Sequence, residues 1–151
     1  MLKIICVGKI KEKYLEDAIK EYQKRLSKYT KLEIISLPDY DYENDLLTKE
    51  KEKELILKNI NSKDYIITLE LEGNMITSEE FAKKIDSIFN TNSNITFIIG
   101  GSYGLADEIK QMSNYHLSFS KMTFPHQLFR VVLLEQIYRA FKINKNESYH
   151  K

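Results

Sequence analysis

Short apolar runs alternate with longer amphipathic segments along nearly the whole chain, and this alternation restricts the fold more than any other feature of the sequence. Strands that alternate with helices favour an α/β fold with a mainly parallel sheet flanked by helices. No internal repeat, low-complexity stretch or linker divides residues 1–151, which we expect to form a single domain. The apolar runs, which predict buried strands, cover residues 2–7, 32–37, 65–71, 95–99 and 117–119.

The segments between these runs predict helices, and several boundary residues support the assignment. Thr77 and Glu80 form a capping-box pattern, and Pro125 suits the first turn of the last helix. Gly73 is expected to end the third strand, and residues 39–45 are expected to form an acidic, tyrosine-containing loop. The expected helices cover residues 14–29, 48–60, 77–89, 105–112 and 125–143.

The last helix is apolar on nearly every face, which is unusual for a domain of this size. A helix of this kind must be buried on all sides, whereas a sheet covers one side only. We therefore expect its other side to meet a second copy of the chain in a homodimer. The alternative is that this helix is enclosed by its own chain. The apolar positions are Leu128, Phe129, Val131, Val132, Leu133, Leu134, Ile137, Tyr138, Ala140 and Phe141.

The charge of the chain is unevenly distributed, although its net value is only +1. Counted by residue, it is +4 over 1–37, −8 over 38–108 and +5 over 109–151. Basic ends are compatible with an anionic partner. Solvated helix faces are the alternative explanation for the same pattern.

Cysteine and histidine usage bears on compartment and metal binding. Cys6 is the only cysteine, so no internal disulfide can form and a reducing, cytoplasmic compartment is expected. The first eight residues are too short and too soon charged for a signal peptide, and no apolar run is long enough to span a membrane. His116, His126 and His150 have no metal-ligand spacing, so we expect no metal site.

Two loops that follow predicted strands are candidates for ligand binding. Gly100, Gly101 and Gly104 follow a buried strand, and glycines there let the backbone approach a ligand closely. Their spacing matches neither a dinucleotide fingerprint nor a phosphate loop. The second loop, residues 119–126, leads into a helix N-terminus where Lys121 would favour an anion. The alternative to ligand binding is a tight strand-to-helix turn for the glycine loop and a capped helix start for the second loop.

The C-terminal tail ends in Tyr149, His150 and Lys151. These residue types can stack on a nucleobase, hydrogen-bond to it and meet phosphate. A frayed chain end without a function is the alternative.

Taken together, these residues resemble the ribosomal RNA large subunit methyltransferase H family of the SPOUT superfamily of knotted methyltransferases. The resemblance runs from end to end, and the stretch 118–127 and the terminal Tyr-His are its most specific parts. Two departures are Cys6, where alanine is usual, and a short acidic loop at 39–47. The matching segments are Val7-Gly8-Lys9, Lys11-Glu12-Lys13-Tyr14, Glu21-Tyr22, Lys24-Arg25-Leu26, Thr68-Leu69-Glu70, Phe97-Ile98-Ile99-Gly100-Gly101-Ser102, residues 117–127, Arg130-Val131, residues 135–140 and Tyr149-His150-Lys151.

The resemblance implies a fold and a reaction. It implies a homodimer with a deep trefoil knot near the C-terminus and S-adenosylmethionine held in that knot. It implies methylation of N3 of a pseudouridine in the intersubunit stem-loop of 23S rRNA, within an assembled ribosome. The residues that would contact the cofactor are Leu69, Gly100, Phe119, Ser120, Lys121, Met122, Thr123 and Phe124.

By the same resemblance, Arg139, Tyr149 and His150 would surround the target base. The acceptor nitrogen must lose a proton, which His150 could take as a base, or Arg139 could stabilise the resulting anion. Both roles stay open at this point. Two other functions also remain, namely an enzyme of the same fold that methylates transfer RNA and a non-catalytic RNA-binding module.

Overall fold

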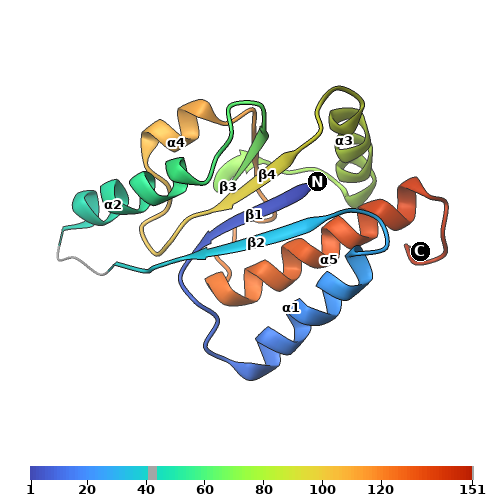
Figure 1. Ribbon diagram of the computed structural model, residues 1–151, viewed down its shortest axis with the longest axis horizontal. Helices are drawn as coiled ribbons and strands as arrows, with labels where there is room; N and C mark the ends of the chain where they lie inside the picture. Colours follow the sequence, from blue (N-terminus) through green and yellow to red (C-terminus); the bar gives the residue numbers. More distant parts are fainter. Residues whose placement is uncertain (41–43, 151) are drawn as a thin grey trace.

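A five-stranded parallel sheet forms the centre of the molecule, with strand order β2-β1-β4-β3-β5 (Figure 1). The computed structural model describes residues 1–40 and 44–150. Residues 41–43 of the expected acidic loop and Lys151 of the tail lie outside the described residues. The strands are β1 (Leu2–Val7), β2 (Leu32–Leu37), β3 (Tyr65–Asn74), β4 (Ile95–Ile99) and β5 (Tyr115–Leu117).

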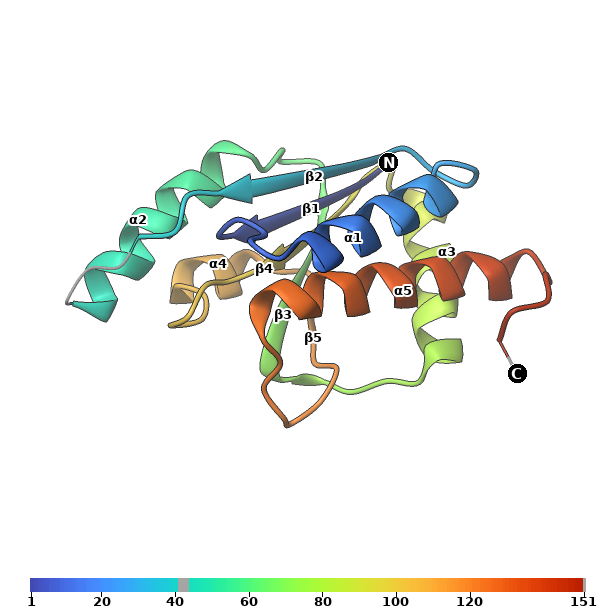
Figure 2. The ribbon, with the colours of Figure 1, turned by 90° about the horizontal axis from the view of Figure 1, so that it is seen from below.

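Helices cover both faces of the sheet, as the predicted α/β class requires. One face carries α1, α3 and α5, with α5 packed between the other two, and the opposite face carries α2 and α4 (Figures 1 and 2). The helices are α1 (Lys13–Leu26), α2 (Asp45–Lys58), α3 (Ser78–Thr91), α4 (Asp107–Met112) and α5 (His126–Asn144).

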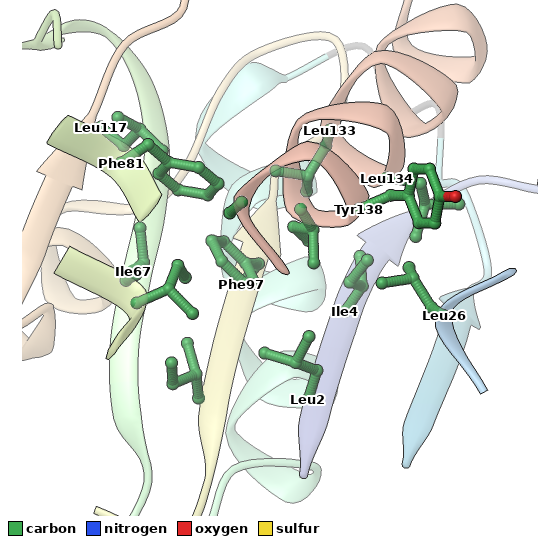
Figure 3. Close-up of a cluster of buried hydrophobic side chains, with 14 of the residues drawn as sticks. Leu2, Ile4, Leu26, Ile67, Phe81, Phe97, Leu117, Leu133, Leu134 and Tyr138 are labelled. Atoms are coloured by element: carbon green, nitrogen blue, oxygen red, sulfur yellow. The ribbon is translucent and has the colours of Figure 1, made fainter. Parts of the chain in front are cut away.

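The central strands are buried on both sides, which explains why they read as continuous apolar runs. Successive residues point to opposite faces, so Ile4 packs under α1 and α5 while Ile5 packs under α2 and α4. Figure 3 shows the larger core, where Phe97 of β4 lies between side chains of α3 and α5. The Phe97 ring is 6.2 Å from that of Phe81.

The predicted strands at the positions of β1, β2 and β4 are confirmed, whereas the prediction for the edge of the sheet is wrong in two places. Gly73 does not end β3, which continues to Asn74. A Cβ on Gly73 would lie 2.8 Å from the carbonyl carbon of Leu117, so the missing side chain lets β3 pass close to β5. The strand expected at 117–119 ends at Leu117, and Ser118 donates its N–H to Asn74 beyond a register shift.

Helix boundaries follow the capping residues. The capping box of Thr77 and Glu80 is present at the start of α3. Asn44 caps α2 by accepting a hydrogen bond from the N–H of Leu46. Because of this cap, the helix begins at Asp45, three residues before the start at residue 48 that the apolar periodicity predicts. Pro125 precedes the first residue of α5 rather than lying within its first turn.

The long helix α5 is enclosed partly by its own chain. Leu133 and Leu134 are fully buried between the sheet, α1 and α3. Leu128 is 40% exposed, and Val131 and Val132 are half-buried. The single chain therefore leaves an apolar strip along the first turns of α5, and the expected homodimer stays a prediction. No helix within the described parts of the chain is long and apolar enough to cross a membrane.

Candidate active site

A cavity of about 370 Å³ opens where β3, β4 and β5 end. Its walls come from the glycine loop 100–104, the end of β3 and the segment 118–124. The two loops singled out in the sequence therefore meet at the carboxyl edge of the sheet, where ligands of open parallel sheets bind. Of the eight residues expected to contact a cofactor, the cavity is lined by Leu69, Gly100, Phe119, Ser120, Met122, Thr123 and Phe124. The eighth, Lys121, is exposed and does not line it.

The glycine loop is a tight turn and a cavity wall at the same time. Gly104 has φ +80° and donates its N–H to the carbonyl of Gly101 at 3.0 Å. A Cβ on Gly100 would lie 2.9 Å from the carbonyl carbon of Gly104, so the two backbones approach in a way that excludes a side chain. The glycines are therefore needed for the tight turn, and the same turn can also bind a ligand in the cavity.

The segment 118–124 is held by hydrogen bonds and by aromatic packing. The Ser118 hydroxyl lies 3.1 Å from the carbonyl of Leu71, and Met122 donates its N–H to Ser120 Oγ at 2.9 Å. The rings of Phe119 and Phe124 lie 5.0 and 5.7 Å from that of Phe129 on α5. Met122, at 78% exposed, lies at the cavity rim.

Three charged residues of the cavity wall are not among the site residues expected from the sequence. Glu70, Glu72 and Lys110 all line the cavity. Glu70 Oε2 accepts the hydroxyl hydrogen of Thr68 at 2.6 Å and also contacts Nδ1 of His116. The sequence signal was the position of Glu70 at the end of an apolar run, directly after Leu69.

The three residues expected around the target base lie together at the end of α5 and on the tail. Arg139 Nη1 is 3.0 Å from His150 Nδ1, and the Arg139 guanidinium lies 4.8 Å from the centre of the Tyr149 ring. Glu135 accepts from Arg139 Nη2 at 2.7 Å, and this hydrogen bond is the main reason that the pKa of Arg139 is raised. The Arg139 guanidinium therefore stays protonated, beside the Glu135 carboxylate.

The described part of the tail, up to His150, is docked and not frayed. The Tyr149 ring packs edge-on against Tyr138 at 5.0 Å, and its hydroxyl lies 3.3 Å from Glu135 Oε1. His150 Nε2 lies 2.5 Å from Glu79 of α3. The pKa of Glu79 is lowered, first by a hydrogen bond from its own backbone and then by that of His150.

Within one chain, however, the tail cluster and the cavity are far apart. Phe129 lines the cavity, and Arg139 follows it by ten residues, which is about 15 Å along a helix axis. Figure 2 shows the C-terminus at one end of α5 and the loop from β5 at the other. The described residues also contain no group of three or more His, Cys, Asp or Glu that could hold a metal ion.

Comparison with known proteins connects this geometry to a family. A family model described as "Predicted SPOUT methyltransferase" matches residues 1–150. Proteins named ribosomal RNA large subunit methyltransferase H from Clostridium perfringens and Clostridium botulinum are 57% and 58% identical to this chain over 155 residues. Each comparison covers 98% of this chain and 98% of the relative.

A solved structure supports the same fold at much lower identity. A probable methylase family protein from Haemophilus influenzae matches with a TM-score of 0.59 and 15% identity, over 99% of this chain and 70% of the other. The family model matches nearly every residue of the chain, and the identity to the clostridial proteins extends over nearly the same length. Both matches therefore include the loops that line the cavity. The chain therefore belongs to the SPOUT methyltransferases and, among them, to the ribosomal RNA large subunit methyltransferase H family.

Proposed function

We propose that this protein transfers a methyl group from S-adenosylmethionine to N3 of a pseudouridine in 23S rRNA of the assembled ribosome. The observation that carries the proposal is the cavity of about 370 Å³, which is lined by seven of the eight residues that the family resemblance assigns to the donor. The relatives are named for methylation of large-subunit ribosomal RNA.

The cavity suits such a donor in size and in lining. Its volume falls within the range of small-molecule sites, and most of its wall is apolar. Leu69, Leu117 and Phe124 offer apolar surface to an adenine, while the glycine loop offers backbone groups for hydrogen bonds. We infer from family membership that these loops belong to a deep trefoil knot. When bound, the donor supplies an activated methyl group on a sulfonium, so neither a metal nor a covalent nucleophile is required.

The tail cluster is suited to hold the acceptor base. Tyr149 offers a ring for stacking, and Arg139 offers a fixed positive charge. The N3 proton would leave to solvent water, and the electron pair left on N3 would form the bond to the methyl carbon while the bond from that carbon to sulfur breaks and its electron pair stays on the sulfur of the thioether product. Arg139 would stabilise the negative charge that develops on the imide.

The contacts of His150 favour positioning over proton abstraction. A guanidinium can only donate, so His150 Nδ1 accepts from Arg139 and Nε2 carries the hydrogen that faces Glu79. Both ring nitrogens are then engaged, and His150 orients Arg139. We therefore assign the stabilising role to Arg139 and the positioning role to His150.

A homodimer would bring the two halves of the site together. The cavity lies near the start of α5 and the tail cluster near its end, so one chain alone does not join them. Antiparallel pairing of two copies along the apolar strip of Leu128, Val131 and Val132 would place one tail beside the partner's cavity. The proposed active site is therefore composite.

A transfer assay with labelled S-adenosylmethionine tests the function. Ribosomes from a strain that lacks this activity should accept label at a single pseudouridine, and transfer RNA should not. Label in transfer RNA alone would establish the other methyltransferase function. If calorimetry shows no donor binding, the protein is a non-catalytic RNA-binding module.

A further inference from the structure

Glu52 of α2 is a buried carboxylate without a partner. The residue is 3% exposed, and neither carboxylate oxygen has a hydrogen-bond partner among residues 1–40 and 44–150. Both oxygens lie within 3.0 Å of the position that a Cβ on Gly101 would occupy. Val7 of β1 also approaches this position, at 3.2 Å. Glu52 therefore packs against the backbone of the glycine loop.

The charged groups around Glu52 do not neutralise it. Asp39, after β2, adds a second negative charge. Arg130 of α5 donates to the carbonyls of Val7 and Gly8 at 2.8 and 2.7 Å, and Lys53 of α2 is paired with Glu50 and Glu108.

Burial, and to a lesser degree Asp39, raises the pKa of Glu52 to about 7. A buried, unpaired carboxylate destabilises a fold, so its presence here requires an explanation beyond packing. A neutral residue of the same volume would avoid the cost.

Gly101 separates Glu52 from the donor cavity. It lines the cavity on one side and meets the Glu52 carboxylate on the other, and it has no side chain to widen the gap. The electric field of a buried charge is weakly screened over one residue of backbone. A cation in the cavity would therefore interact with an ionised Glu52.

We propose that Glu52 is a specificity-determining residue whose carboxylate, acting across Gly101, favours a cationic occupant of the cavity over a neutral one. This inference rests on the proposed donor. S-adenosylmethionine carries a sulfonium, whereas its demethylated product, S-adenosylhomocysteine, is a neutral thioether with the same adenosine and amino-acid groups. Glu52 would thereby favour exchange of product for donor.

The proposal has a pH signature with a defined sign. Ionisation of Glu52 near neutral pH strengthens binding of the cation, so donor affinity should rise as pH increases from about 6 to about 8. Product affinity should change much less, and the donor-to-product affinity ratio should rise by about tenfold. Donor binding at pH 7 should also release a fraction of a proton, because the cation lowers the pKa of Glu52.

Calorimetry with both ligands at pH 6, 7 and 8 tests this on the full-length protein. Glu52→Gln should lose the pH-dependent change in the ratio. Glu54→Gln is the matched control, because Glu54 lies on the exposed side of the same helix. An unchanged ratio in wild type, or the same change in Glu52→Gln, would overturn the inference while leaving the donor assignment intact. Absence of donor binding would overturn both.

The wild-type protein alone provides a second measurement in case Glu52→Gln does not fold. Donor titrations at pH 7 in two buffers of different ionisation enthalpy report the protons released. Release with S-adenosylmethionine but not with S-adenosylhomocysteine supports the inference, and equal values for the two ligands overturn it.

Discussion

Arg139 on α5 and His150 on the tail lie 3.0 Å apart, between Nη1 and Nδ1, and this contact fixes the C-terminal tail against the helix that also borders the cavity at the ends of β3, β4 and β5. His150 is held from the other side by Glu79 of α3. Tyr149 and His150 are therefore an ordered part of the fold, and their removal has predictable consequences for catalysis and for stability.

Deletion of residues 149–151 should abolish methyl transfer while leaving donor affinity within about twofold, because the cavity walls lie elsewhere. Loss of the Tyr149 packing should lower the free energy of unfolding by roughly 1–2 kcal/mol. Ribosome methylation, calorimetry and denaturant unfolding measure these effects. Ser148→Ala, at an exposed position of the same tail, should behave as wild type. Full-rate methylation by the truncated chain would show that the tail has no catalytic role.

His150→Ala distinguishes positioning from proton abstraction. If His150 only orients Arg139, the fractional loss of rate should be the same at every pH between about 6 and 9. If His150 is the base, the loss should shrink as pH rises toward the pKa of the imide. Single-turnover methylation of ribosomes over this range gives the comparison, with donor kept saturating.

Gly100→Ala should weaken donor binding by at least tenfold, about 1.4 kcal/mol. Its Cβ would meet the backbone of Gly104 and displace the cavity wall. Gly104→Ala is the control, because its Cβ has no atom within 4 Å but its φ of +80° is strained for alanine. That variant should lose about 1 kcal/mol of stability with a smaller effect on affinity. Equal donor affinity in folded Gly100→Ala and wild type would contradict this role.

Leu128→Glu tests the dimer without disturbing the core, because Leu128 is 40% exposed in one chain. Light scattering at micromolar concentration should give a dimer mass for wild type and a monomer mass for the variant. Methyl transfer should fall with the dimer, since the proposed active site needs both chains. By contrast, Leu133→Glu should unfold the protein, because Leu133 is fully buried within its own chain. A monomeric wild type that methylates ribosomes would refute the composite site.

Glu52→Gln should stabilise the ligand-free protein at pH 8 and have little effect at pH 4.5. The pKa of Glu52 is about 7 in the folded state against an ordinary value of 4.5, so the folded state binds the proton more tightly. Ionisation therefore costs wild-type stability as pH rises between these values, by roughly 1–3 kcal/mol. Denaturant unfolding at several pH values, with Glu54→Gln as control, gives the free energy of unfolding of each variant relative to wild type. This difference should grow with pH only for Glu52→Gln. If it is the same at every pH for Glu52→Gln, the pKa of Glu52 is not raised from 4.5 to about 7.

The alternation of apolar runs and amphipathic segments was sufficient to predict the fold class and most elements. Strands such as Ile95–Ile99 are buried on both faces, so their whole sequence is apolar and their limits are visible. The loops that line the cavity were also identifiable, because they follow strands at one edge of a parallel sheet. That these loops hold the donor remains a prediction.

The sheet edge and the acidic helix were decided by tertiary contacts. Gly73 looked like a strand end, yet β3 continues because β5 approaches its backbone. In α2, basic and acidic residues alternate from Lys49 to Glu54, so the residue types alone do not distinguish Glu52 from its exposed neighbours. Only the packing of α2 against the glycine loop shows which carboxylate is buried.

Local patterning thus determined what each segment becomes, because periodicity and capping act over a few residues. The sequence by itself also grouped Arg139 with Tyr149 and His150 through the family resemblance. Only the tertiary structure decided that this cluster lies at the far end of α5 from the cavity, and that Glu52 lies behind Gly101. Such relationships depend on how distant segments pack across the sheet, and no short-range pattern in a single sequence records that arrangement.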